Sequence, residues 1–219
     1  MDKDYNFAVE IYKKYKHSYE NLLAQSESIK DYSVVWSDFG FEFYPFQDFI
    51  DFGIKKPAKI YKNKPDGESG YIESRFIENE IYYAFNPMYK TSGAVFIVDN
   101  NGDKISLKFD EEYCGEEEKV FLHYFCLLVY KDEKIDKVLN YLNKESEEHE
   151  SFYSSQFLYN ADGKIDMIVR DGKHRQYSKE LITVPTFRYR FEYVDGKTLI
   201  YHKQLKPEET EEKLIFSKK

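Results

Sequence analysis

Apolar side chains recur every three or four positions through residues 4–28, which is the period of an amphipathic α-helix. Asp4 suits the N-cap of such a helix, because aspartate is one of the residue types favoured there. The apolar stripe consists of Ala8, Ile11, Tyr12, Tyr15, Tyr19, Leu22 and Leu23. The pattern therefore predicts one helix over residues 4–28.

From residue 32 onward the apolar positions form short runs or alternate with polar ones, as in β-strands. Residues 33–36 and 39–44 fit short strands. The segment 45–57 is less regular and is bounded by two prolines, so a turn or a short helical turn is expected there.

A hairpin pattern then repeats along the chain at intervals of about 30 residues. Four windows, residues 95–107, 127–138, 156–168 and 190–200, each place a turn between two arms of alternating polarity. Their anchor residues are Val98, Tyr130, Tyr159 and Tyr193. Three of the turns carry the dipeptides Asn101-Gly102, Asp162-Gly163 and Asp195-Gly196, which are suited to the positive φ angles of tight hairpin turns. Residues 71–83 fit a fifth, weaker hairpin.

The segment 120–142 is compatible with two structures. Its apolar residues fit helical spacing, and the acidic residues before it suit a helix N-terminus. Against a helix, residues 130–136 mirror the hairpin of residues 159–166, and residues 121–130 form an unbroken run rich in aromatic and branched side chains. Strands are favoured here, with the helix kept as the alternative.

These patterns predict an α+β fold that is mainly antiparallel β, built from serial hairpins with a repeat of about 30 residues, plus an N-terminal helix. Residues 1–58 would hold the helix and the short strands, and residues 59–219 the repeated hairpins, within one continuous domain. A composition of 18% aromatic residues, with 21 Tyr and 18 Phe, agrees with strands, because aromatic side chains fit a pleated surface.

The hairpins resemble the tyrosine-anchored YD repeats of bacterial Rhs-type proteins, in which a tyrosine opens a turn closed by glycine, a basic residue and an aliphatic residue. Tyr159, Gly163, Lys164 and Ile165 match that layout, and Tyr193, Gly196 and Lys197 match part of it. The chain departs from the family pattern in three ways: Asn160 replaces an aspartate, lysine replaces arginine, and the Tyr130 copy has no glycine. In size and composition the chain is also similar to small acidic proteins of bacterial toxin–immunity loci.

The net charge of −8 argues against nucleic acid as a partner and is compatible with a basic protein partner, although solubility alone also explains it. Two acidic clusters lie at the ends of the contested segment. They supply the candidate partner-binding residues Glu116, Glu117, Glu118, Glu145, Glu147 and Glu148.

Location and thiol chemistry follow from other features of the sequence. Cys114 and Cys126 are interpreted as free thiols, since a secreted disulfide scaffold of this size carries more cysteines. No apolar run approaches the ~20 residues of a membrane span, and residues 1–5 lack a signal-peptide pattern. We therefore expect a cytoplasmic protein that does not bind membranes.

No sequence motif of a catalytic or cofactor site is present, so we expect neither an enzyme nor a cofactor. The five histidines are scattered and predict no metal site. Residues 99–103 resemble a calcium loop, but they lack its later glutamate and fit a hairpin turn better. Residues 171–175, on an expected connecting loop, could form a small anion site with Arg188 and Arg190, and a solvated loop explains them equally well.

The leading functional hypothesis is a non-enzymatic bacterial protein-binding protein, in its most specific form an immunity protein that masks a basic toxin domain. One alternative is a structural module of YD-like repeats. Another is a small-molecule binder or enzyme in which a curved sheet encloses a cavity near His123, Tyr124 and Tyr141.

Overall fold

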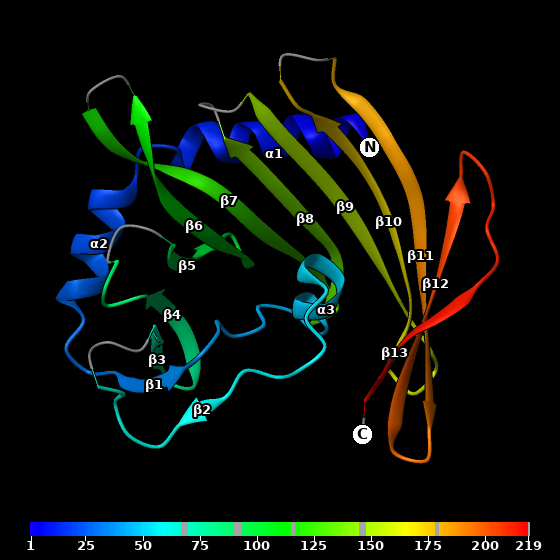
Figure 1. Ribbon diagram of the computed structural model, residues 1–219, viewed down its shortest axis with the longest axis horizontal. Coiled ribbons are helices and arrows are strands. Elements are labelled where there is room, and N and C mark those ends of the chain that lie inside the picture. Colours follow the sequence, from blue (N-terminus) through cyan, green and yellow to red (C-terminus); the bar gives the residue numbers. More distant parts are fainter. Residues whose placement is uncertain (67–69, 90–92, 115–116, 145–147, 178–179, 219) are drawn as a thin grey trace. The chain divides into compact units, whose positions relative to one another are not determined.

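The computed structural model describes residues 1–66, 70–89, 93–114, 117–144, 148–177 and 180–218, with the backbone alone for 112–114, 117, 118 and 218 (Figure 1). Its contacts divide the chain into two compact units. The first unit consists of Met1–Glu10 with Cys126–Lys219, and the second unit is Ile11–Phe125. The first helix and the seventh strand contribute residues to both units. The expected division after residue 58 stays a prediction.

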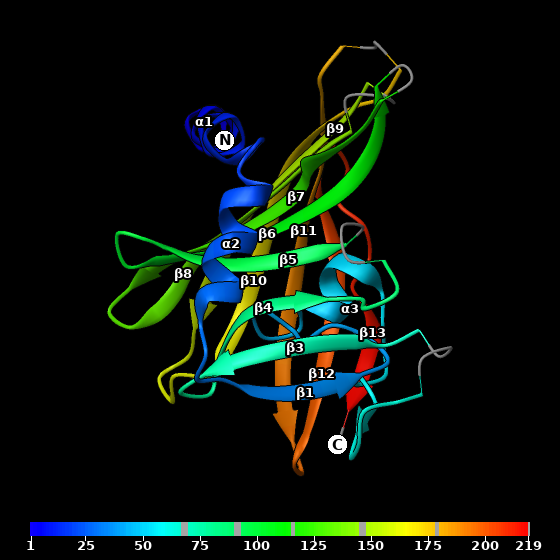
Figure 2. The same ribbon diagram turned by 90° about the vertical axis from the view of Figure 1, so that its left-hand side faces the viewer.

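The second unit contains a meander of antiparallel strands in the order β7-β6-β5-β4-β3-β1-β2. Only the position of β1, which lies between β3 and β2, departs from sequential order. Figure 2 shows β1, β3, β4 and β5 side by side. The strands are β1 Ser33–Ser37, β2 Ile60–Tyr61, β3 Ile72–Ile77, β4 Glu80–Phe85, β5 Ala94–Asn100, β6 Asp103–Cys114 and β7 Glu117–Lys131.

The first unit continues the same scheme in the order β13-β12-β11-β10-β9-β8-β7, so every strand pairs with its neighbour in sequence. Its further strands are β8 Lys134–Lys144, β9 His149–Tyr159, β10 Ile165–Arg175, β11 Ile182–Val194, β12 Lys197–Lys206 and β13 Lys213–Lys218. The prediction of a mainly antiparallel protein built from serial hairpins is therefore confirmed. Residues 120–142 form β7 and β8, as favoured, and residues 71–83 form the β3–β4 hairpin.

The N-terminal helix is interrupted, contrary to the sequence prediction. Helix α1 spans Asp2–Tyr15 and α2 spans Tyr19–Ser28. The carbonyl of Lys16 accepts a hydrogen bond from the main-chain amide of Leu122 instead of continuing the helix, and the Ser18 hydroxyl donates to the Tyr15 carbonyl at 2.8 Å. Asp4 therefore lies inside α1 and is not its N-cap.

The predicted apolar stripe of these helices forms part of the core. Ala8, Ile11, Tyr12, Tyr19 and Leu22 are all buried. In the second unit the Tyr19 ring of α2 packs against Phe96 of β5 and Phe109 of β6, both fully buried. Amphipathic periodicity thus identified the buried face although it missed the break.

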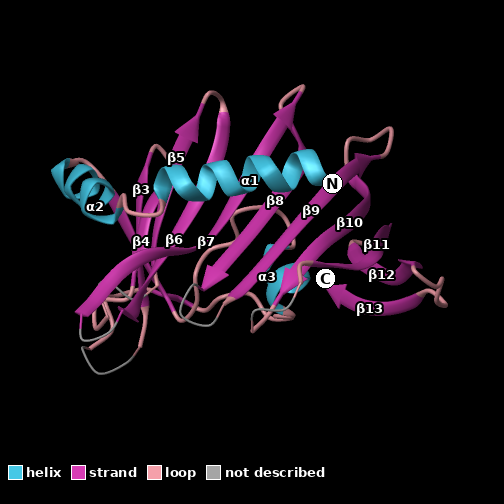
Figure 3. Cartoon of the chain, turned by 90° about the horizontal axis from the view of Figure 1, so that it is seen from above, coloured by secondary structure: helices cyan, strands magenta, loops and turns pink. Residues whose placement is uncertain are grey.

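Within the first unit, the N-terminal part of α1 crosses β8, β9 and β10 (Figure 3). Asp4 pairs with Lys137 of β8 at 2.8 Å, and Asp2 pairs with Lys173 of β10 at 2.7 Å. Between these two contacts, the Tyr5 ring packs edge-on against Phe152 of β9.

Two further local predictions were wrong. Residues 39–44 form no strand. Side chains bond to part of their main chain: Gln47 accepts from the Phe43 amide, and Ser37 donates to the Phe39 carbonyl. Residues 171–175, expected on a loop, are the last residues of β10. The expected helical turn in residues 45–57 is confirmed as α3 Gln47–Phe52.

The tight turns use positive φ angles as predicted, with one correction. Asn101, Gly102, Asp195 and Gly196 all have positive φ. In the remaining glycine-containing turn Gly163 has positive φ and Asp162 does not. Instead, the Asn160 side chain accepts main-chain hydrogen bonds from Asp162 and Lys164, both at 3.0 Å, which closes a longer turn.

Candidate functional site

A groove of about 360 Å³ lies at the tips of two hairpins of the second unit, β3–β4 and β5–β6. Its apolar walls come from the last residues of β3, the start of β4 and the end of β5. These residues are Ile77, Ile81, Tyr82, Ile97 and Val98. Ile77 is 38% exposed, so part of the apolar wall is open to solvent.

The polar part of the groove is mainly acidic. Three carboxylate residues, Glu78, Glu80 and Asp99, line it together with one ammonium group, that of Lys104. The Lys104 ammonium lies 2.6 Å from the Glu80 carboxylate, so it neutralises one acid. Glu78 and Asp99 contribute the remaining negative charge. The groove therefore combines apolar walls with a net negative rim.

Turn geometry places these carboxylates. Glu78 and Asn79 both have positive φ, at 49° and 71°, and form the two-residue turn between β3 and β4. Glutamate is uncommon in this left-handed region, which costs roughly 1–2 kcal/mol for a residue with a Cβ. Asp99 precedes the Asn101-Gly102 turn, where one of its carboxylate oxygens accepts a hydrogen bond from the Gly102 amide at 3.3 Å.

The glutamates selected from the sequence are different from the described residues that line this groove. Glu116, Glu145 and Glu147 lie outside the described residues. Glu117 and Glu118 begin β7, where only the backbone is described. Glu148 is exposed in the turn before β9, with a positive φ of 48°. Their partner-binding role stays a prediction.

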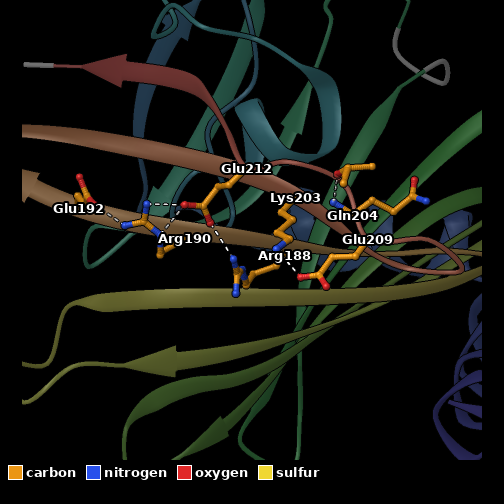
Figure 4. A network of polar contacts seen from close by, with 8 residues as sticks. Arg188, Arg190, Glu192, Lys203, Gln204, Glu209 and Glu212 are labelled. Carbon is orange, nitrogen blue, oxygen red and sulfur yellow. Dashed lines mark hydrogen bonds and ion pairs between the residues drawn. The ribbon is translucent and has the colours of Figure 1, made fainter.

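The basic residues proposed as an anion site contact acidic groups of the chain itself. Figure 4 shows Glu212 between Arg188 and Arg190, at 2.8 and 2.6 Å. Hydrogen bonds from Arg190 and Arg188 hold the pKa of the Glu212 carboxyl below its usual value. Lys203 pairs with Glu209 in the same network. These contacts favour a cross-strand ion-pair network over an anion site.

Glu150 is a second centre of polar contacts in the first unit. Its carboxylate is buried and accepts hydrogen bonds from the hydroxyls of Tyr5 at 2.6 Å and Tyr141 at 2.7 Å. Arg175 pairs with its other oxygen. Burial raises the pKa of Tyr5 to about 12, and the hydrogen bond to Glu150 acts in the same direction. The cluster therefore holds neutral tyrosines around one paired carboxylate and fixes α1 on the sheet.

The aromatic residues proposed to line a ligand cavity are engaged within their own units. The Tyr141 hydroxyl contacts Glu150, as described above. The Tyr124 hydroxyl donates to Asp51 of α3 at 3.4 Å. The groove at the β3–β4 and β5–β6 tips is lined by other residues.

Three wider findings bear on function. In the described part of the chain, no helix is long and apolar enough to cross a membrane. No group of three or more His, Cys, Asp or Glu side chains among the described residues is arranged to hold a metal ion. The sequence matches no protein-family model, and comparison with curated proteins and with solved structures gave no match.

Proposed function

We propose that this chain is a non-enzymatic protein-binding protein, and that the groove at the β3–β4 and β5–β6 tips receives a basic segment of its partner. In the most specific form of this proposal, the protein is a bacterial immunity protein that masks a basic, cytoplasmic toxin domain. The observation that carries the proposal is the pairing of apolar walls with an acidic rim in one groove.

Lysine and arginine side chains have the chemistry that this groove would accept. Their aliphatic stems cover apolar surface, while the charged head groups remain at the polar edge. Ile77 and Ile97 offer the apolar contact, and the carboxylates of Glu78 and Asp99 offer charge-assisted hydrogen bonds. A neutral or acidic segment would leave both carboxylates without compensation, so the groove favours a basic ligand.

The net charge of the chain is a second observation compatible with a basic partner. Lys137, Lys173, Arg188, Arg190 and Lys203 all pair with carboxylates of the same unit. Each of these pairs cancels one basic and one acidic group, so attraction for a partner depends on the net charge that remains. With a net charge of −8, long-range attraction would increase the rate of association with such a partner.

The proposal is tested with the polypeptide encoded beside this chain in its genome, which is the expected toxin. The double variant Glu78→Gln/Asp99→Asn removes both uncompensated charges of the groove. Binding of the neighbouring polypeptide should weaken by about tenfold, as expected for the loss of two charge-assisted contacts at a partly exposed rim.

The matched control is Glu20→Gln/Glu27→Gln, which removes two exposed carboxylates of α2 and changes the net charge by the same amount. This control should keep binding within about twofold of the unsubstituted chain, because neither glutamate lines the groove and an exposed charge outside the contact contributes little affinity. Equal losses in both double variants, or no binding of the neighbouring polypeptide at all, would contradict the proposal.

A second candidate function is a structural module of YD-like repeats, supported by one contact that recurs in consecutive hairpins. The Tyr159 hydroxyl bonds to the Ile135 carbonyl, and the Tyr193 hydroxyl bonds to the Ile165 carbonyl. A contact of this kind could continue through a longer array. This alternative predicts longer relatives in which each hairpin carries the tyrosine and the following lysine; relatives restricted to this chain length would contradict it.

A further inference from the structure

Two histidines and one serine converge at the end of the β9–β10 hairpin that lies farthest from its tight turn. The Ser151 hydroxyl lies 2.8 Å from Nδ1 of His174 and 3.2 Å from Nε2 of His149. The two imidazole rings are 5.1 Å apart, centroid to centroid, and nearly perpendicular. Two ring nitrogens from different strands are therefore directed at the same oxygen atom.

Strand register produces this arrangement. His149 and Ser151 are two positions apart on β9, so their side chains emerge on the same face. His174 of β10 is the Cα partner of Ser151 in the antiparallel ladder and shares that face. Glu150, between His149 and Ser151, points to the opposite face, where it contacts Tyr5 of α1. The three side chains are thus held by paired strands rather than by a loop.

We propose that His149 and His174 form a binding site for a divalent transition-metal ion such as Cu²⁺, Ni²⁺ or Zn²⁺, with the Ser151 oxygen beside it. Imidazole nitrogen is a preferred ligand for these ions, at a metal–nitrogen distance of about 2.0–2.1 Å. The two nitrogens both contact the Ser151 oxygen, at 3.2 and 2.8 Å, so an ion that displaces this hydroxyl from between them would meet an imidazole nitrogen from each strand.

The described part of the site consists of these three side chains. Among the described residues no third His, Cys, Asp or Glu joins the two histidines. Affinity should follow the general order in which Cu²⁺ binds more tightly than Ni²⁺ or Zn²⁺. Mg²⁺ prefers oxygen ligands and should not bind. This site is independent of the groove in the second unit and of the function proposed for it.

The test is isothermal titration calorimetry of the whole chain with each metal ion alone. We expect one Cu²⁺, Ni²⁺ or Zn²⁺ to bind per chain. His149→Ala or His174→Ala should weaken binding at least about tenfold, since loss of a residue that only hydrogen-bonds to a metal ligand already lowers metal affinity 10–100-fold. His17→Ala is the matched control: it removes an exposed imidazole elsewhere and should bind as the unsubstituted chain does.

A second measurement avoids substitutions and any loss of folding that they cause. Paramagnetic Ni²⁺ or Cu²⁺ added to the unsubstituted chain should broaden the amide NMR signals of residues 149–151 and 173–175 before all others. Zn²⁺ binding should also raise the thermal midpoint as its concentration exceeds the dissociation constant. Absence of binding, unchanged binding in both histidine variants, or broadening centred elsewhere would overturn the proposal.

Discussion

The Tyr159 hydroxyl donates a 2.8 Å hydrogen bond to the main-chain carbonyl of Ile135 and so joins the β9–β10 hairpin to the hairpin before it. Tyr193 makes the same contact with Ile165, at 2.9 Å, one hairpin further along. Each tyrosine lies just beyond the end of a ladder. The β8–β9 ladder begins with Lys137 opposite Gln156, and the β10–β11 ladder begins with Met167 opposite Arg190. The hydroxyl therefore satisfies a carbonyl that the ladder does not reach.

Tyr159→Phe and Tyr193→Phe should each lower the free energy of unfolding by about 1 kcal/mol, because each removes one partly buried hydrogen bond and keeps the aromatic ring. Urea unfolding of each variant measures this loss. Tyr177→Phe is the matched control, since Tyr177 is 67% exposed and its loss should have almost no effect. Equal stability of all three variants would show that the contact between hairpins does not hold them together.

The β7–β8 turn should become more stable when Glu133 is replaced by glycine. Asp132 and Glu133 both have positive φ, at 51° and 62°, although neither is glycine. Relief of this strain, offset by the greater freedom of glycine in the unfolded chain, should raise the free energy of unfolding by about 0.5–1 kcal/mol in Glu133→Gly.

Gly196 occupies in the β11–β12 turn the position that Glu133 occupies in the β7–β8 turn, so the reverse change, from glycine to a residue with a Cβ, can be tested there. Its φ is +71°, and a Cβ there would meet no atom within 4 Å. Gly196→Ala should therefore destabilise the protein through the backbone alone, by about 1 kcal/mol. Denaturant unfolding of both variants is the measurement, and a destabilised Glu133→Gly would contradict this explanation of the turn.

Stability should fall as the pH rises from 10 to 12, in part because of Tyr5. Its pKa in the folded chain is about 12, whereas a tyrosine in the unfolded chain titrates near 10. Between these values the unfolded state has lost a proton that the folded state keeps, so rising pH favours unfolding. Burial also raises the pKa of Tyr141, the other hydroxyl on Glu150, in the same direction.

Tyr5→Phe separates this contribution from other alkaline effects. The variant should be less stable than the unsubstituted chain at pH 9, because it lacks the hydrogen bond to Glu150. The difference should narrow as the pH approaches 12, since the variant has no hydroxyl to titrate at that position. Parallel pH profiles from urea unfolding would contradict the assigned role of Tyr5.

Local sequence patterns predicted the features of the fold that depend on residues close together in the sequence. The dipeptides Asn101-Gly102 and Asp195-Gly196 located two turns, and the apolar period located the buried face of α1 and α2. The break after Tyr15 could not be predicted, because it depends on the amide of Leu122, which lies far along the chain.

The candidate sites were missed for the same physical reason. Ile77 and Val98 line one groove only because β4 pairs with β5 and places two hairpin tips together. His149 and His174 face each other only in the register of β9 with β10. The sequence does mark the groove in one respect, since acidic residues flank both turns, but acidic turns occur elsewhere in the chain.

The central claim is that a basic partner enters the groove at the β3–β4 and β5–β6 tips. Methyl NMR of Ile77, Ile81 and Ile97 reports on its apolar walls directly. Titration with the neighbouring polypeptide should shift these three methyl signals, and Glu78→Gln/Asp99→Asn should reduce the shifts at equal concentration. If the partner binds while these methyl signals stay in place, the groove is not the binding site and the account is contradicted.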